Sequence, residues 1–441
     1  MAKQKRATGS AKSRPDLRAK PATVKAAQPE NVEESPRIAA EELAKLQREI
    51  SIAEFFTKNR HLLGFDNPRK ALLTTIKEGV DNSLDACEEA RILPEVKVAV
   101  AQTNGADRFK VTIEDNGPGI VKAQIPRIFA KLLYGSKFHR LKMSRGQQGI
   151  GISAAGLYGQ LTTGKPICIT SKIAPNKPAH YYQLQIDTQH NEPHIIKDEE
   201  VKWDHKQGTK VEIELEAKYQ KGKGSIDDYL EQTAIANPHT TLIYVTPEGE
   251  ERKFQRAIPQ LPVEPKEIKP HPYGIELGML IKMLQSTSAS TLQGFLCRDF
   301  SRVSPRIAKE ICDRAKVYDR ARPSRIARQE ADNLLQSIRS TKIMNPPTNC
   351  LSPIGEEQLL KGLRKQIEAE FYAATSRAPS VYRGNPFQVE AAIAYGGGLS
   401  EEGFVRLLRF ANRVPLLYQQ SACAMTRSVA TTDWRNYGLQ Q

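Results

Sequence analysis

The stretch KEGVDNSLDACEEA, residues 77–90, places an amide among carboxylates inside a segment with helical periodicity. Glu78, Asn82 and Asp85 are spaced i, i+4 and i+7, so they share one helix face. A second face is apolar and carries Leu72, Leu73, Ile76, Val80 and Leu84. An amide oxygen that faces a site can bind Mg²⁺, and a neighbouring carboxylate can deprotonate a water as a general base. The alternative is a solvated acidic face on which the amide is incidental.

A second motif, VTIEDNGPGI at residues 111–120, follows in the chain. It ends a predicted strand with Asp115 and continues through Gly117 and Gly119, which predict a turn. A carboxylate at a strand end, with glycines that remove side-chain bulk behind it, suits a flat ligand with an exocyclic amine. Adenine is such a ligand.

A third motif, SRGQQGIGISAAGLYG at residues 144–159, places three glycines before an alanine-rich helical run. Backbone N–H groups at such a helix start can reach phosphate oxygens. The basic segment before it, residues 134–146, is predicted to fold over a nucleotide as a lid; the alternative is a plain surface loop. Further on, Gly208 and Thr209 open a predicted strand and are placed at the pocket wall.

Composition narrows the class of protein. The chain has 441 residues and a formal net charge of +15, which favours a polyanionic partner, nucleic acid first. No apolar run is long enough to span a membrane. Six scattered cysteines without a CxxC pair indicate reduced thiols in a cytoplasmic protein, neither a disulfide framework nor a zinc site.

The patterns divide the chain into four parts. Residues 1–45 form a predicted disordered basic tail, and residues 46–262 mix helices and strands as an α+β domain. Residues 263–346 are predicted to be mostly helical, and residues 347–441 mix both kinds of element. Further predicted helices cover residues 35–56, 124–135, 354–374 and 400–414.

The ordered set EGVDNSLDA, EDNGPGI, GQQGIGIS and QGT resembles the boxes of the GHKL (Bergerat) ATPase fold, shared by gyrase, Hsp90, histidine kinases and MutL. Longer stretches resemble the B subunits of type IIB DNA topoisomerases, the topoisomerase VI family: FFTKNRHLLGFDNPRKAL, KPHPYGIELG and LLRFANRVPLLY. The resemblance implies a GHKL α/β sandwich, then a helix–two-turn–helix insert and a partial α/β transducer domain.

The resemblance also implies roles for single residues. Glu78 would be the general base, Asn82 would hold Mg²⁺, and Asp115 would read the adenine amine. Ser136 and Lys137 would contact ATP from the lid. The phosphates would be wrapped by Gly146, Gln147, Gln148, Gly149, Ile150, Gly151, Ile152 and Ser153. The remaining expected nucleotide-site residues are Asp85, Gly117, Gly119 and Thr209.

In this family, ATP closes a dimer of B subunits around double-stranded DNA, and a partner A subunit cleaves a second duplex. The resemblance therefore implies an A2B2 topoisomerase that relaxes supercoils and decatenates DNA at the nucleoid, without a membrane. The family's transducer lysine and the helix that binds the A subunit lie beyond a segment like DWRNYGL, residues 433–439, and are expected to be absent here.

Other readings of the motifs remain open. A histidine kinase is disfavoured because no His precedes residue 54 as a phosphoacceptor. A MutL-like clamp shares the ATPase boxes but not the longer stretches. A DNA-binding scaffold that hydrolyses ATP weakly or not at all would keep the basic surfaces; Glu78 argues against it, and the missing lysine argues for it.

Overall fold

The computed structural model describes residues 45, 47–105, 107–137, 140–146, 149–222, 224–399, 405–417 and 423–438. Backbone contacts divide the chain into two compact units, residues 1–49 and residues 50–441. The predicted basic tail lies outside the described residues, apart from Lys45. Within the described ranges, every helix is too short or too polar to cross a bilayer.

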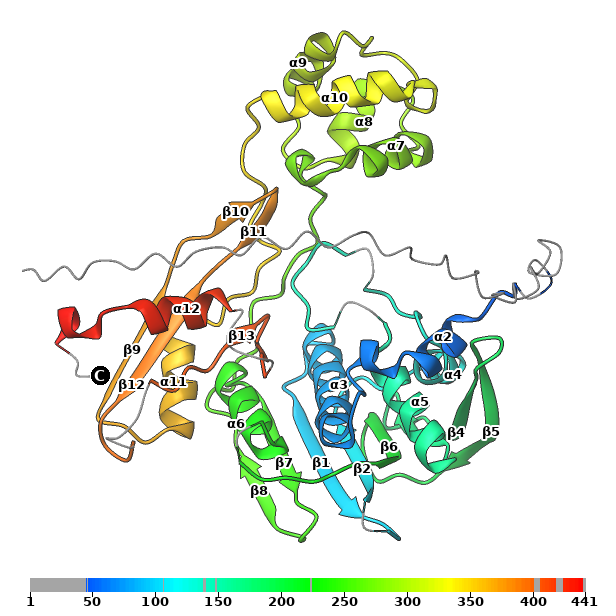
Figure 1. Ribbon diagram of the computed structural model, residues 1–441, viewed down its shortest axis with the longest axis vertical. Helices are drawn as coiled ribbons and strands as arrows, with labels where there is room; N and C mark the ends of the chain where they lie inside the picture. Colours follow the sequence, from blue (N-terminus) through cyan, green and yellow to red (C-terminus); the bar gives the residue numbers. More distant parts are fainter. Residues whose placement is uncertain are drawn as a thin grey trace, which may run out of the picture. The chain divides into compact units, whose positions relative to one another are not determined.

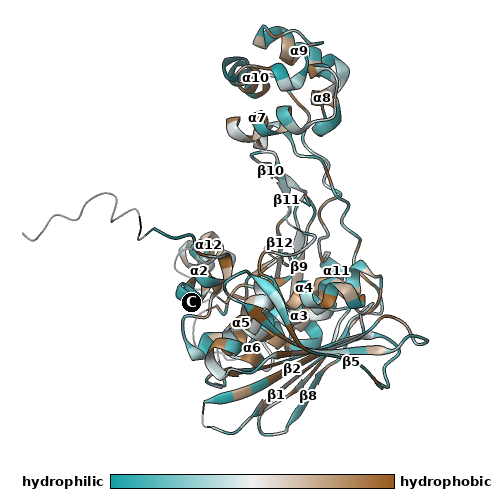
Figure 2. Ribbon diagram, turned by 90° about the vertical axis from the view of Figure 1, so that its right-hand side faces the viewer, coloured by the Kyte–Doolittle hydropathy of each residue, from teal (hydrophilic) through white to brown (hydrophobic). Residues whose placement is uncertain are grey.

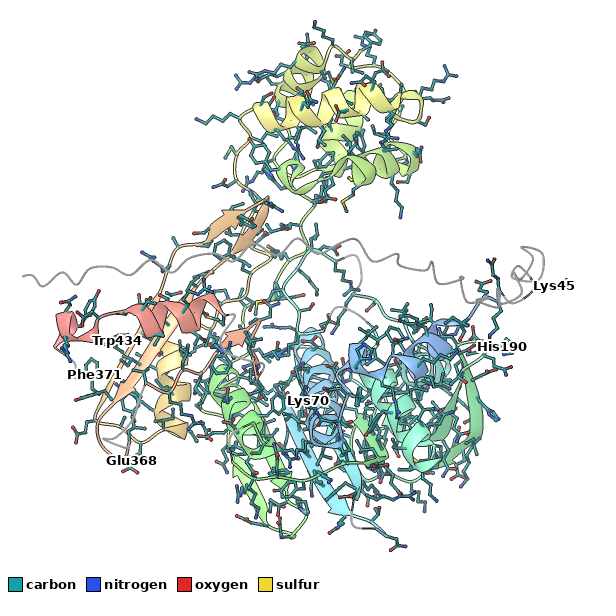
Figure 3. The ribbon with its side chains drawn as sticks, viewed as in Figure 1. Lys45, Lys70, His190, Glu368, Phe371 and Trp434 are labelled. Carbon is teal, nitrogen blue, oxygen red and sulfur yellow. The ribbon has the colours of Figure 1, made fainter. Side chains whose placement is uncertain are left out.

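Helix α3, Pro68–Glu89, contains residues 77–89 of the first motif. Its start follows from local chemistry, because the Asn67 side chain accepts a hydrogen bond from the Lys70 N–H and Pro68 takes the first helical position. Lys70 marks this first turn in Figure 3. The apolar face of α3 is buried against strands of the sheet, as its periodicity predicts.

An eight-stranded sheet has the order β5-β4-β3-β6-β2-β1-β7-β8. The β1–β7 pair is parallel, and the other pairs are antiparallel. The strands are β1 Glu95–Gln102, β2 Arg108–Asp115, β3 Ile167–Lys172, β4 Ala179–Asp187, β5 Glu192–Val201, β6 Gly208–Glu216, β7 Thr241–Val245 and β8 Glu251–Phe254. The sequence predicts all of these except β5 and β8, which are exposed, charged edge strands without an apolar alternation.

Helices cover one face of this sheet, as the two ribbon views show (Figures 1 and 2). Besides α3 they are α4 Ile125–Ala130, α5 Gly151–Thr163 and α6 Ile226–Ala236, with α2 Ile52–Lys58 before them. Side chains alternate between buried and exposed along β1 and β2, as expected for a sheet with one covered face. One hydrophobic core therefore joins the helices to the sheet.

Two predicted helices are shorter than expected here. The described part of residues 35–56 becomes helical from Ile52, apart from Lys45. The helix predicted over 124–135 ends at Ala130, because Lys131 is extended and Leu133 has a φ of 59°, which a helix cannot accommodate.

A second hydrophobic cluster belongs to the helical part of the chain. Its helices are α7 Leu277–Ser286, α8 Leu292–Asp299, α9 Pro305–Ala315 and α10 Arg328–Ser340. Thr291 and Ser304 cap α8 and α9 through their hydroxyl groups. Short 3₁₀ turns connect elements throughout the chain: Arg60–Leu63, Lys122–Gln124, Pro272–Gly274, Pro323–Arg325 and Trp434–Tyr437.

The C-terminal part corrects two predictions. The helix predicted over 354–374 ends early as α11, Glu356–Gln366, and its remaining apolar residues enter β9. The helix predicted over 400–414 is wrong for the described residues 405–414, where Asn412 and Arg413 have φ of 50° and 66° and form a hairpin turn. The elements here are β9 Phe371–Ser376, β10 Ser380–Tyr382, β11 Asn385–Phe387, β12 Glu390–Tyr395, β13 Phe410–Ala411, β14 Val414–Pro415 and α12 Ala424–Thr431.

Candidate nucleotide site

Glu78 projects from α3 toward the start of α5. A Cβ atom added to Gly151 would lie 1.8 Å from Oε2 of Glu78, so any larger residue at the start of α5 would displace the Glu78 carboxylate. Burial raises the pKa of Glu78 above its ordinary value, although Lys77, with Nζ 3.5 Å from Oε1, opposes this. A carboxylate with a raised pKa is a stronger base than an ordinary one, and Glu78, 28% exposed, can still be reached by water.

Asn82 lies one turn further along α3 and is exposed. A Cβ atom on Gly146 would lie 3.9 Å from Oδ1 of Asn82, so the two residues are neighbours. Within the described ranges, no group of three or more His, Cys, Asp or Glu could hold a metal ion. The amide oxygen fits Mg²⁺ in the way nucleotide sites use it, with few protein ligands and the rest from phosphates and water.

Asp115 lies at the end of β2 and is buried, with 8% of its surface exposed. Its Oδ1 accepts hydrogen bonds from the N–H groups of Gly117, at 2.9 Å, and Thr209, at 3.2 Å. Its Oδ2 accepts one from the Ser83 hydroxyl at 2.9 Å. These donors fix the orientation of the carboxylate and leave acceptor capacity on Oδ2 for an incoming amine.

Two residues at this position were not predicted from the sequence. Ser83 comes from α3, and its signal is a small polar residue among the buried positions of an amphipathic helix. Ser171 is the last but one residue of β3; its hydroxyl accepts from the Ile120 N–H at 2.8 Å and lies 3.1 Å from Oγ1 of Thr209. No local pattern marks Ser171, because its partners are distant in the sequence.

The glycines after Asp115 serve the protein's own packing. Gly119 has a φ of +69°, and a Cβ atom there would lie 2.1 Å from the carbonyl oxygen of Lys172. A Cβ atom on Gly117 would lie 2.9 Å from Oδ1 of Asp115. The atoms that exclude a side chain at these two glycines belong to the protein itself. The glycines are therefore explained without the ligand that the sequence argument assumed.

We expect Gly119→Ala to lower the free energy of unfolding by roughly 2–5 kcal/mol, the sum of left-handed strain and a backbone clash. Gly164→Ala is the matched control, because Gly164 has a φ of +74° with nothing within 4 Å. It should lose about 1 kcal/mol, from strain alone. Urea unfolding followed by circular dichroism measures both. Equal losses would contradict the role of the close contact.

The predicted phosphate segment lies at the start of α5. Gly149 has a φ of +58°, and Gly151 is the first helical residue, whose N–H lacks a helical partner. The side chains of Ile152 and Ser153 are buried, and the Ser153 hydroxyl donates to the Ile150 carbonyl at 3.1 Å. Gln147 and Gln148 lie outside the described residues. Among the described residues of this turn, only backbone groups are thus available to bind phosphates.

Two residues of the predicted lid, Lys137 and Arg145, form ion pairs with Asp85. The Lys137 ammonium pairs with Oδ2 of Asp85, and Arg145 donates to Oδ1 at 2.8 Å. Asp85 is buried, and these two ion pairs connect it to the segment before the glycine motif. Ser136 is exposed. Contacts of Asp85, Ser136 and Lys137 with nucleotide remain predictions.

We expect nucleotide affinity to fall as the pH is lowered through about 6, because burial raises the pKa of Asp115 from 3.8 to about 6, against the hydrogen bonds from Gly117 and Ser83. A protonated carboxyl group loses acceptor strength toward an adenine amine. The same shift favours folding fully below pH 3.8, and that contribution is lost as the pH rises through about 6. Calorimetric titration of ADP from pH 5 to 8 tests this. Asp115→Asn is the control, since the nucleotide still titrates but residue 115 does not. If the parent and Asp115→Asn proteins show the same dependence of affinity on pH, the prediction is contradicted.

Two family models and several known proteins are similar to this chain. Residues 67–219 match the family described as histidine kinase-, DNA gyrase B- and HSP90-like ATPase. Residues 346–441 match the topoisomerase VI B subunit transducer. The ATPase domain of Thermus thermophilus gyrase B, solved with an aminocoumarin, is 15% identical over 46% of this chain and 50% of that chain, with a TM-score of 0.32.

Two archaeal relatives, both B subunits of type 2 DNA topoisomerase 6, are similar over most of the chain. The protein of Methanococcoides burtonii is 54% identical over 91% of this chain and 65% of its own length. That of Natronomonas pharaonis is 35% identical over 91% of this chain and 73% of its own length. The chain thus spans somewhat less than two thirds of the first relative. It belongs to the family of type 2 DNA topoisomerase 6 B subunits, with a GHKL ATPase fold and a region that matches the transducer domain.

Proposed function

We propose that this chain binds and hydrolyses ATP with Mg²⁺ at the residues that α3, the end of β2 and the start of α5 bring together. Three side chains support the proposal, two from α3 and one from the end of β2. Buried Asp115 is oriented by Ser83, Glu78 lies against Gly151, and exposed Asn82 lies beside Gly146. We assign them the roles of adenine acceptor, base and metal ligand, in that order: Asp115, Glu78 and Asn82.

In this proposal each group has its own task. Oδ2 of Asp115 accepts the adenine amine, and the N–H groups at the start of α5 bind the phosphates. Mg²⁺ held at the Asn82 amide would neutralise phosphate charge. Glu78 orients a water and takes its proton as the water attacks the terminal phosphate.

At the level of the whole assembly, we propose a subunit of a type IIB DNA topoisomerase. Support comes from the names of the relatives, from the transducer match and from the net charge of +15, which favours DNA. ATP would drive dimerisation of this chain around one duplex, and a partner A subunit would cleave a second duplex at the nucleoid. The helical part, α7 to α10, would be the helix–two-turn–helix insert.

ATP hydrolysis with and without supercoiled DNA, and with and without an A subunit, tests the proposal. We expect DNA to stimulate hydrolysis, and a non-hydrolysable analogue to convert monomers to dimers in light scattering. Adding salt should weaken DNA binding, because the contacts are made with phosphates. Nucleotide binding without turnover under every condition would favour the scaffold reading instead.

A further inference from the structure

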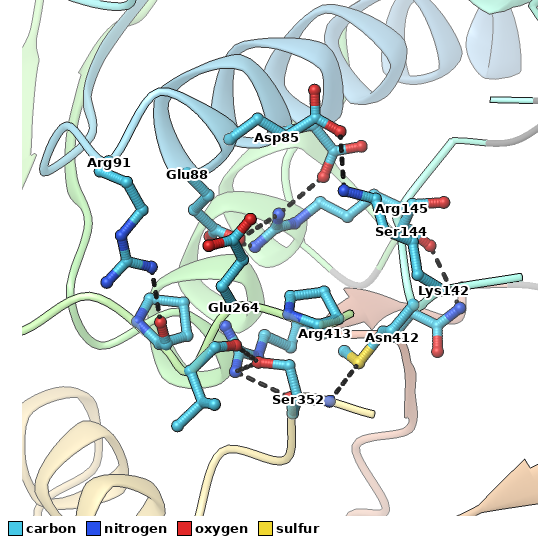
Figure 4. Close-up of a pocket in the computed structure, with 15 residues that line it drawn as sticks. Asp85, Glu88, Arg91, Lys142, Ser144, Arg145, Glu264, Ser352, Asn412 and Arg413 are labelled. Atoms are coloured by element: carbon cyan, nitrogen blue, oxygen red, sulfur yellow. Dashed lines mark hydrogen bonds and ion pairs between the residues drawn. The ribbon is translucent and has the colours of Figure 1, made fainter. Parts of the chain in front are cut away.

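Buried charges join the segment before the glycine motif to α3, as the dashed contacts in Figure 4 show. The Arg145 side chain, 4% exposed, donates to both oxygens of Glu88, at 2.6 and 3.0 Å, and to Asp85 at 2.8 Å. A two-point contact between guanidinium and carboxylate fixes orientation as well as distance. The residue directly before Gly146 is therefore held in one place.

Glu88 is held from a second side by His239, whose Nε2 lies 2.7 Å from Oε1. Burial alone would raise the pKa of Glu88, but Arg145 and His239 hold it well below its usual range. The Glu88 carboxylate is therefore charged throughout the neutral range, and its attraction for Arg145 does not depend on pH there.

The same anchor reaches the C-terminal part of the chain. Asn237, which ends α6, accepts from Arg145 through Oδ1 and donates to the carbonyl of Arg413 at 3.2 Å. The Asn412 amide donates to the Ser144 carbonyl at 3.2 Å, and the Met143 N–H donates to the Cys350 carbonyl at 2.9 Å. Residues 140–146 are thus held between α3 and segments distant in sequence.

We propose that Arg145 is a positioning residue for nucleotide binding, because it fixes one end of the glycine segment so that Gly146 stays beside Asn82. The other end is already fixed where α5 begins, against Glu78. This inference rests on the proposed ATP-binding function. It assigns Arg145, Glu88 and His239 a task at the site although none of them is required to touch the nucleotide.

A looser anchor has a specific kinetic consequence. It lowers the fraction of molecules in which Gly146 lies beside Asn82, and the apparent dissociation constant rises by the inverse of that fraction. Once nucleotide is bound, its phosphates hold the backbone at Gly146 in place. The KM for ATP should therefore change much more than kcat, whereas a general loss of structure would lower the amount of active protein and leave KM unchanged.

The test is Arg145→Lys, which keeps the charge and loses the two-point contact. We expect the KM for ATP and the Kd of a non-hydrolysable analogue to rise about tenfold, with kcat within about threefold of the parent. Arg252→Lys is the matched control, because Arg252 on β8 is 38% exposed and makes its two-point contact with Glu250, outside the predicted lid and the glycine motif. It should leave both constants unchanged. Hydrogen exchange should rise at residues 140–146 in the Arg145 variant alone.

Unchanged KM and Kd in folded Arg145→Lys protein would overturn the inference while leaving the proposed function intact. If the parent protein binds no analogue at all, the proposed ATP-binding function is contradicted, and the inference about Arg145 falls with it. Should Arg145→Lys not fold, Glu88→Gln replaces it, since the amide keeps the shape and one acceptor oxygen. A rise in Kd with a normal far-UV spectrum would then support the inference, and an unchanged Kd would overturn it.

Discussion

Replacing Glu78 with Gln is expected to lower the kcat for ATP hydrolysis by about 10²–10⁴-fold, the usual contribution of a general base. The amide cannot take a proton from the attacking water, but it has the same shape, so α5 can still begin beside it at Gly151. Nucleotide affinity should change little, because binding depends on Asp115 and on the backbone N–H groups of α5. Coupled-enzyme assays measure turnover, and titration with a fluorescent analogue measures binding.

The control for this variant is Glu250→Gln, which removes a carboxylate in the turn before β8, where Glu250 pairs with Arg252. It should hydrolyse ATP at the parent rate. Glu78→Gln protein that still hydrolyses ATP at that rate would exclude Glu78 as the base. Loss of binding together with turnover would instead indicate that Glu78 shapes the pocket.

Replacing Asp115 with Asn should weaken nucleotide binding by roughly 10- to 150-fold, since hydrogen bonds to a charged group contribute about 1.5–3 kcal/mol. Oδ1 can still accept from Gly117 and Thr209, so the turn should be retained. In place of Oδ2 stands an amide nitrogen that donates, and it would meet the donor hydrogens of an adenine amine. The loss should therefore be in affinity, and saturating ATP should restore much of the turnover.

Glu114→Gln is the matched control, because Glu114 is the neighbouring carboxylate on β2, 22% exposed and paired with His205 at 2.9 Å. Its side chain lies on the opposite face of the strand from Asp115. Calorimetry with ADP should show the parent affinity for this control. Equal affinity in the parent and Asp115→Asn proteins would show that Asp115 does not bind the adenine amine.

Much of the ATPase part could be predicted from the sequence because its signals are local. The spacing of Ile76, Val80 and Leu84 predicts α3, and it places Glu78 and Asn82 away from the buried face, where the structure has them. Strand alternation predicts the central strands for the same reason. The predictions failed where apolar residues occur without the period of their element, as at residues 405–414 and 371–374.

Helix α3 and the order of the nucleotide motifs follow from the sequence alone, because helix period, capping and glycine spacing act over a few residues; the family was indicated by resemblance to known proteins. What surrounds these motifs depends on tertiary packing. It brings Tyr229 to Asp81, at 3.3 Å, and it brings Lys137 and Arg145 to Asp85. It also brings Thr209 to Asp115 across 94 positions of chain. These contacts follow from how distant strands and helices pack together, and no local period of the sequence encodes that packing.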